Sequence, residues 1–184
     1  MTAFLFACNF FMSGGYYLYN MVINFHELYQ KYAQDVYRFA YWLCGDAQDA
    51  EDITSETFVR ALTSADEIRT ETVKGYLLTI ARNLAFKRTK RTNRLADLTP
   101  GLPALSNGPE QTTETNLSLR GVMQFLQTLP EIDRAALLMH TQDNLSYEEI
   151  SKALGISLTA AKVKVHRTRL KLNTYRMKEE ESRS

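Results

Sequence analysis

The stretch LSYEEISKALGISLTAAKVKVHRTRLKL, residues 145–172, decides the fold class of this 184-residue chain. Ser146, followed three residues later by Glu149, forms a capping-box pattern that predicts the start of a helix. Gly155 comes after that helix, where a tight turn favours a residue that tolerates positive φ. Ser157 can cap a second helix. A short helix, a glycine turn and a second helix at this spacing predict a helix-turn-helix.

The second helix of this motif is basic, since every charged residue between positions 158 and 172 is a cation. Ala161 and Val165 give it a narrow apolar side, and its size suits the DNA major groove. A recognition helix enters the groove by its first turns, so we expect Thr159, Lys162 and His166 to read bases. The expected DNA-binding set is completed by Lys164 and by three residues that we expect on phosphates, Arg167, Arg169 and Lys171. An ordinary hairpin with a solvated basic face is the alternative, and the register of both caps and the turn favours DNA binding.

Helical patterning also fills residues 25–95. Apolar residues recur at three- and four-residue steps from Phe25 until Gly45, a helix stop. Ala50, Ile53 and Leu62 help to mark a second helix, residues 63–72 are polar and loop-like, and residues 73–94 suggest a third helix. Residues 97–116 hold three prolines and two glycines, which predicts a flexible linker.

The pattern therefore predicts an all-α fold of two small helical modules joined by a flexible linker, with the helix-turn-helix in the second. The expected boundaries are an N-terminal extension (1–24), the first module (25–95), the linker (96–117), the second module (118–177) and a tail (178–184). The run from Phe4 to Met12 is too short to span a bilayer. It is open to three interpretations: a loose hydrophobic arm, a membrane-touching tail, or a start codon chosen too early.

The net charge of +1 conceals local blocks. Residues 46–56 carry five acids and no Lys or Arg, whereas residues 82–94 carry six cations and no acid. The two cysteines lack metal-ligand spacing and fit a reducing cytosol. The three histidines are scattered, and no nucleophile elbow or phosphate loop is present, which argues against an enzyme. We expect His140, on an apolar helix, to be half-buried with a hydrogen-bond partner. No metal, cofactor or small-molecule substrate is expected.

Three segments resemble extracytoplasmic-function (ECF) sigma factors of RNA polymerase. Residues 129–172 resemble region 4, which implies that the helix from Leu158 recognises the promoter −35 element. The segment DAEDITSETFVRAL, residues 49–62, resembles the part of region 2 that docks on the coiled coil of the largest polymerase subunit. The segment KGYLLTIARNLAFKRTKR, residues 74–91, resembles the helix that reads and opens the −10 element.

The resemblance implies two further sets of site residues. The residues expected to face polymerase are Asp49, Asp52, Glu56 and Arg60, at spacings that share one helix face. The residues expected at the −10 element are Tyr76, Arg82, Asn83, Lys87, Arg88 and Arg91, with Asn83 at the pocket for a flipped-out base. The chain departs from the family pattern at Tyr76, where tryptophan is common, and at Lys87, where aspartate is frequent. In the second module it departs at Ser151 and at residues 142–144, Gln-Asp-Asn, which replace the usual Glu-Gly.

The resemblance implies a cytoplasmic sigma factor, not an enzyme, that binds core RNA polymerase and directs promoter recognition and DNA opening. Its expected partners are core polymerase, promoter DNA and an anti-sigma factor. The alternative is a helix-turn-helix transcriptional regulator that does not associate with core polymerase. That alternative explains residues 145–172 but leaves the segments at 49–62 and 74–91 without a role.

Overall fold

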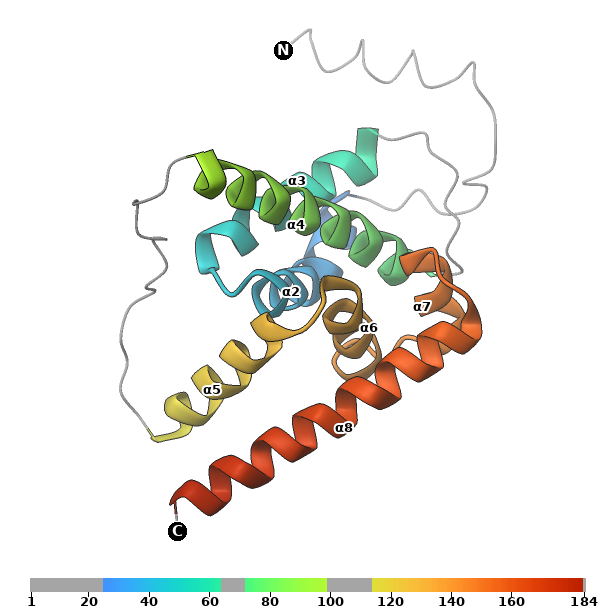
Figure 1. The fold of residues 1–184 in the computed structure, drawn as a ribbon. Helices are drawn as coiled ribbons and strands as arrows, with labels where there is room; N and C mark the ends of the chain where they lie inside the picture. The colour runs from blue at the N-terminus through green and yellow to red at the C-terminus, as the bar shows by residue number, and fades with distance from the viewer. Residues whose placement is uncertain (1–24, 64–71, 99–113, 184) are drawn as a thin grey trace, which may run out of the picture. The chain divides into compact units, whose positions relative to one another are not determined.

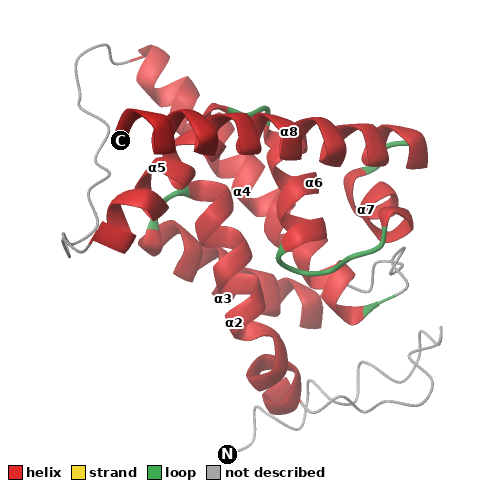
Figure 2. Cartoon of the chain, turned by 90° about the horizontal axis from the view of Figure 1, so that it is seen from below, coloured by secondary structure: helices red, strands yellow, loops and turns green. Residues whose placement is uncertain are grey.

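Helices make up nearly all of the described part of the chain. The computed structural model describes residues 25–63, 72–98 and 114–183, and within them it contains no strand (Figure 2). Seven helices follow one another there (Figure 1): α2 (Phe25–Cys44), α3 (Ala47–Thr63), α4 (Val73–Leu98), α5 (Glu114–Thr128), α6 (Glu131–Thr141), α7 (Tyr147–Leu154) and α8 (Leu158–Arg183). The all-α prediction is confirmed.

Helices α2, α3 and α4 form the first group. Gly45 ends α2 with φ of +81°, and the Oδ1 atom of Asp46 then caps α3 by accepting a hydrogen bond from the Asp49 amide at 2.8 Å. The core of this group is apolar and fully buried, with contributions from all three helices: Val36, Phe39, Leu43, Ile53, Phe58, Leu77 and Leu78. Leu62, which helps to mark helix α3 in the sequence, is 47% exposed. Thr57 is buried instead, and its hydroxyl donates to the Ile53 carbonyl.

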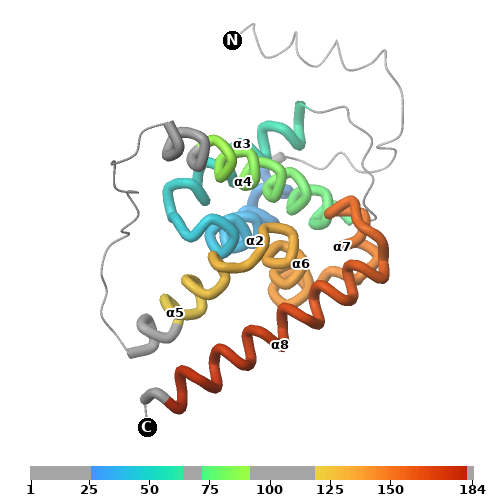
Figure 3. Tube along the Cα trace, in the orientation of Figure 1, coloured from blue at the N-terminus to red at the C-terminus, as the bar shows by residue number. Residues whose placement is uncertain are grey.

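Helices α5 to α8 form the second group. In α6 the seven residues from Asp133 to Met139 are all buried, so this helix is the centre of the group, and α7 and α8 pack against it. The long helix α8 continues past the helix-turn-helix as one rod (Figure 3), and the Tyr175 ring stacks on Phe125 of α5 with centroids 4.8 Å apart. The last part of α8 is thus held by α5.

The helices extend further than the sequence indicated. Helix α4 runs to Leu98 and α5 begins at Glu114, so both reach into the expected linker (96–117). Helix α8 reaches Arg183 and takes in most of the expected tail (178–184). The centre of the linker and the N-terminal extension lie outside the described residues, as does most of the expected loop at 63–72.

The two helix groups contact each other. From Tyr32 onward the described residues form one compact unit, in which α4 packs against α6 and α7 as well as against α3. The −10 helix of the resemblance therefore adjoins the helix-turn-helix. None of the helices in the described ranges is apolar enough over a sufficient length to cross a bilayer.

Candidate nucleic-acid interface

The helix-turn-helix forms as its local sequence predicts. The amide of Glu149 donates to Ser146 Oγ at 3.2 Å, and the amide of Ser146 donates to Glu149 Oε2 at 2.8 Å, which completes the capping box. Gly155 has φ of +64° and ends α7 in the left-handed conformation. Ser157 Oγ then accepts from the Ala160 amide at 3.1 Å and caps α8. Both caps and the turn are confirmed.

Helix α8 is anchored by a narrow inner side. Ala161, Val165 and Thr168 are buried against the rest of the module, and the Thr168 hydroxyl turns back to the Lys164 carbonyl at 2.7 Å. The inner positions recur at steps of three and four residues, so they occupy one stripe of the helix. The opposite side of α8 therefore faces away from the protein.

That outward side carries six of the seven residues expected at the −35 element. The exposed residues are Thr159, Lys162, His166, Arg167, Arg169 and Lys171. Lys164 differs, since its side chain is half-buried and its ammonium pairs with the carboxylate of Asp133 on α6. Its expected contact with DNA stays a prediction, and in this structure Lys164 ties α8 to α6.

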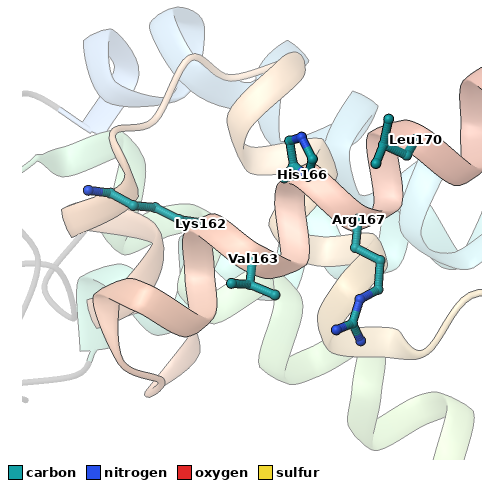
Figure 4. Close-up of a pocket in the computed structure, with 5 residues that line it drawn as sticks. All are labelled: Lys162, Val163, His166, Arg167 and Leu170. Atoms are coloured by element: carbon teal, nitrogen blue, oxygen red, sulfur yellow. The ribbon is translucent and has the colours of Figure 1, made fainter.

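Two apolar residues on the same side were not anticipated. Figure 4 shows a shallow pocket lined by Lys162, Val163, His166, Arg167 and Leu170. Val163 and Leu170 are about half exposed in it. The sequence could have indicated Val163 as part of this surface, because Val163 lies next to Lys162 and four residues before Arg167. An apolar side chain in this position is able to contact the methyl group of thymine in the major groove.

His140 and Tyr147 border the recognition helix. The His140 ring stacks on Tyr147 with centroids 4.6 Å apart, and its Nδ1 lies 3.2 Å from the Leu145 carbonyl oxygen. His140 is half-buried, as expected. The Lys162 ammonium lies 6.0 Å from the centroid of the Tyr147 ring, at the outer limit of a cation–π contact. Tyr147 thus favours a position for Lys162 near the start of the outward side of α8.

The acidic residues of α3 lie on a half-exposed face. Glu56 and Arg60 form an ion pair of 2.8 Å one turn apart. The other two carboxylates, of Asp49 and Asp52, are bridged by Arg88 of α4 at 2.6 and 3.0 Å. Burial acts to lower the pKa of Arg88, but its bonds to Asp52 and Asp49 outweigh burial and raise it. The structure thus joins a residue expected on DNA to two residues expected on polymerase.

The other residues expected at the −10 element differ in exposure along α4. Asn83, Lys87 and Arg91 are exposed and Tyr76 is half-buried. Arg82 is also half-buried, and its Nη2 donates to the Ala153 carbonyl of α7 at 2.6 Å. Burial lowers the pKa of Arg82. No group of three potential metal ligands occurs within the described ranges.

Comparison with known proteins places these features in one family. Residues 28–95 match the family model for sigma-70 region 2, and residues 119–172 match that for sigma-70 region 4. SigL of Mycobacterium tuberculosis, an ECF RNA polymerase sigma factor, is 30% identical over 76% of this chain and 81% of its own length. The chain belongs to the ECF sigma factors. This is not a family of enzymes.

Two further matches give the range of similarity. The ECF sigma factor SigE of Mycolicibacterium smegmatis is 34% identical over 83% of this chain, and the match spans 61% of SigE, less than two thirds of its length. The structure of the sigma factor RpoE with the anti-sigma factor NepR from Bartonella quintana superposes with a TM-score of 0.70. That match covers 82% of this chain and 95% of the other at 22% identity, and it shows a shared fold.

Proposed function

We propose that this sigma factor binds core RNA polymerase and directs promoter recognition and DNA opening when transcription starts. The observation that carries the proposal is the outward side of α8, where exposed cations surround Val163 in a correctly capped helix-turn-helix. The second module (118–177) would read the −35 element. Thr159, Lys162 and His166 would face bases, and Arg167, Arg169 and Lys171 would lie on phosphates.

The first module (25–95) would supply the other two functions. The half-exposed acidic face of α3, with Asp49, Asp52, Glu56 and Arg60, would dock on polymerase. Helix α4 would hold the −10 strand, with the exposed Asn83 at an extruded base and with Lys87 and Arg91 on the backbone. Taking a base from the stack costs a few kcal/mol, and capture of that base offsets part of the cost.

The two modules together would give specificity that neither has alone. A single small module makes few phosphate contacts, whereas two linked modules raise each other's local concentration on DNA. Polymerase would fix their separation, so only a promoter with both elements correctly spaced satisfies both. The sigma factor catalyses no covalent step in this scheme, since polymerase synthesises the RNA. It would act in the cytoplasm, with an anti-sigma factor as its inhibitor.

Transcription from a promoter library tests the proposal. The chain is mixed with core polymerase, and the templates that yield transcripts are sequenced. We expect transcripts only from templates that share two elements at a fixed spacing. A helix-turn-helix regulator independent of polymerase would instead select a single site and give no transcription with core enzyme alone. That result would overturn the proposal.

A further inference from the structure

A buried carboxylate of the second helix group lies against cations of the first. The side chain of Asp143, between α6 and α7, has no exposed surface. Its Oδ1 atom is 3.0 Å from Lys74 Nζ at the start of α4 and 3.9 Å from Arg38 Nη2 on α2. Asp35 of α2 pairs with the same two cations at 2.9 Å each. Two cations from one group thus hold a carboxylate from the other.

The starts of α4 and α7 are joined as well. Thr72 Oγ1 accepts from the Gly75 amide at 3.1 Å, which caps α4, and the same hydroxyl donates to Glu149 Oε1 at 2.7 Å. Glu149 is also the capping-box residue of α7. At the other end of α7, the Ala153 carbonyl accepts from Arg82 of α4. Helix α7 is therefore bonded to the first group at both of its ends.

We propose that these contacts form a polar latch that closes region 2 onto region 4 in the free sigma factor and withholds Arg82 from DNA. The latch residues are Arg38, Thr72, Lys74 and Arg82 in region 2, and Asp143, Glu149 and Ala153 in region 4. The part that concerns Arg82 rests on the proposed function, because it assumes that α4 binds the promoter. The closed arrangement itself does not depend on it.

The chemistry of the latch suits a contact that must open. Burial raises the pKa of Asp143 despite Lys74 and Arg38, so the ionised carboxylate is held at a net cost. Neither of its oxygens has a well-directed hydrogen bond, nor does the buried Nε of Arg82. Opening would return these groups to water, which recovers their solvation. Polymerase or DNA would then need to supply little free energy to separate the regions.

The distance between the regions tests the latch directly. Spin labels are placed on full-length protein at Glu51→Cys in α3 and Met177→Cys in α8, both exposed positions, in a background with Cys8→Ser and Cys44→Ala. We expect one narrow distance distribution for the free protein. Asp143→Lys sets like charges against Lys74 and Arg38 and should broaden and lengthen the distribution. The exchange Lys74→Glu with Asp143→Lys should restore it in part.

Binding of a fluorescent single strand that carries the −10 element from the promoter library supplies the second readout. If nine of ten free molecules are closed, opening raises the apparent affinity about ten-fold. Glu148→Lys is the matched control, since it makes the same charge change at an exposed position of α7. It should alter neither the distance nor the affinity beyond a general charge effect. Lys74→Ala removes the other partner of the same ion pair. It provides the test if Asp143→Lys fails to fold.

The outcomes separate the latch from the proposed function. A distance distribution that neither Asp143→Lys nor Lys74→Ala changes overturns the latch, whatever happens to DNA binding. A lengthened distance with unchanged strand affinity supports closure but overturns the withholding of Arg82 and counts against the role of α4 on DNA. A lengthened distance with tighter strand binding, reversed by the charge exchange, supports the whole proposal.

Discussion

The guanidinium of Arg88 on α4 lies 2.6 Å from the carboxylate of Asp49 on α3. This pair, which Asp52 extends, places the expected polymerase face beside the expected DNA-binding helix. The groups are between one third and two thirds exposed, so solvent screens the interaction. If α3 docks on polymerase and α4 holds the promoter strand as proposed, the bridge gives the first contact a route to influence the second.

Replacing Arg88 with alanine should lower the free energy of unfolding by about 1 kcal/mol or less, because exposed ion pairs contribute little. Urea unfolding of Arg88→Ala, Asp52→Asn and the double variant measures the pair by a double-mutant cycle. A loss near 3 kcal/mol would mean that the bridge is far less solvated than its exposure indicates.

Reversing the charge of Asp52 should weaken binding to core polymerase at least about ten-fold, because a lysine there would face the surface that accepts an acid. Glu51→Lys is the matched control. Glu51 is the neighbouring exposed acid, and the helical repeat turns it to the other side of α3. Affinity is measured with labelled sigma factor and purified core enzyme. Equal losses in the two variants would show a general charge effect and remove the docking assignment from this face.

Replacing Lys162 with alanine should cost about 1–3 kcal/mol at the preferred −35 sequence and blur the preference at one or two base pairs. Arg169→Ala should instead weaken all sequences alike and reduce the salt slope by about one unit. Competition binding with holoenzyme on a −35 library distinguishes these effects. If the two variants exchange behaviours, the helix enters the groove in a different rotation.

Val163 should contribute to sequence choice through a thymine methyl group. One buried methyl contributes about 0.8 kcal/mol, or roughly four-fold in affinity. Thymine-to-uracil changes along the −35 element should therefore cost the wild-type holoenzyme about that factor at one position. In Val163→Ala the penalty at that position should disappear, and the effect of uracil at every other position should be the same as in the wild type. An unchanged uracil profile in Val163→Ala would exclude this contact.

The stability of the chain should decrease in acid partly through Glu149. Burial acts to raise the pKa of Glu149, but hydrogen bonds from Ser146 and Thr72 outweigh it and hold the pKa below its ordinary value. The ionised form therefore stabilises the fold above the ordinary glutamate range, and this contribution is lost as pH falls through the lowered pKa. Thermal unfolding should show that Glu149→Gln is less stable than wild type near pH 7. The difference should be constant down to about pH 5 and should narrow as the pH falls further, below the ordinary glutamate pKa of 4.5. A difference that stays constant through that further fall would contradict the charged role of Glu149.

Local signals were readable in the sequence because their partners lie within one helical turn. The capping box of Ser146 and Glu149 and the left-handed Gly155 depend on neighbours, and the structure confirms each. Lys164 was expected on DNA because it stands among cations, but its partner Asp133 is 31 positions away. The bridge from Arg88 to Asp49 joins residues 39 positions apart. No periodicity reports such pairs, since tertiary packing decides them.

The contacts of the latch could not be read from the sequence either. Asp143 stood out as a departure from the family pattern, yet its sequence neighbours do not indicate that Lys74 and Arg38 surround it. The roles of the residues expected on polymerase and DNA remain predictions, because they depend on molecules outside the chain. Exposure on α3 and α8 makes most of those contacts sterically open, and the half-burial of Lys164 and Arg82 sets those two apart.

The stack of Phe125 on Tyr175 couples the C-terminal part of α8 to α5. Helix α5 begins at Glu114, directly after residues 99–113, and α8 is a continuous helix of 26 residues, about 39 Å long, whose first turns are expected to read DNA. A change in the length of that segment would act on α5 and, through the stacked rings, on the C-terminal part of α8. Shortening residues 99–113 should therefore change the orientation of the proposed base-reading end of α8. The length of this segment would then set the preferred spacing between the two promoter elements, rather than the affinity for either element.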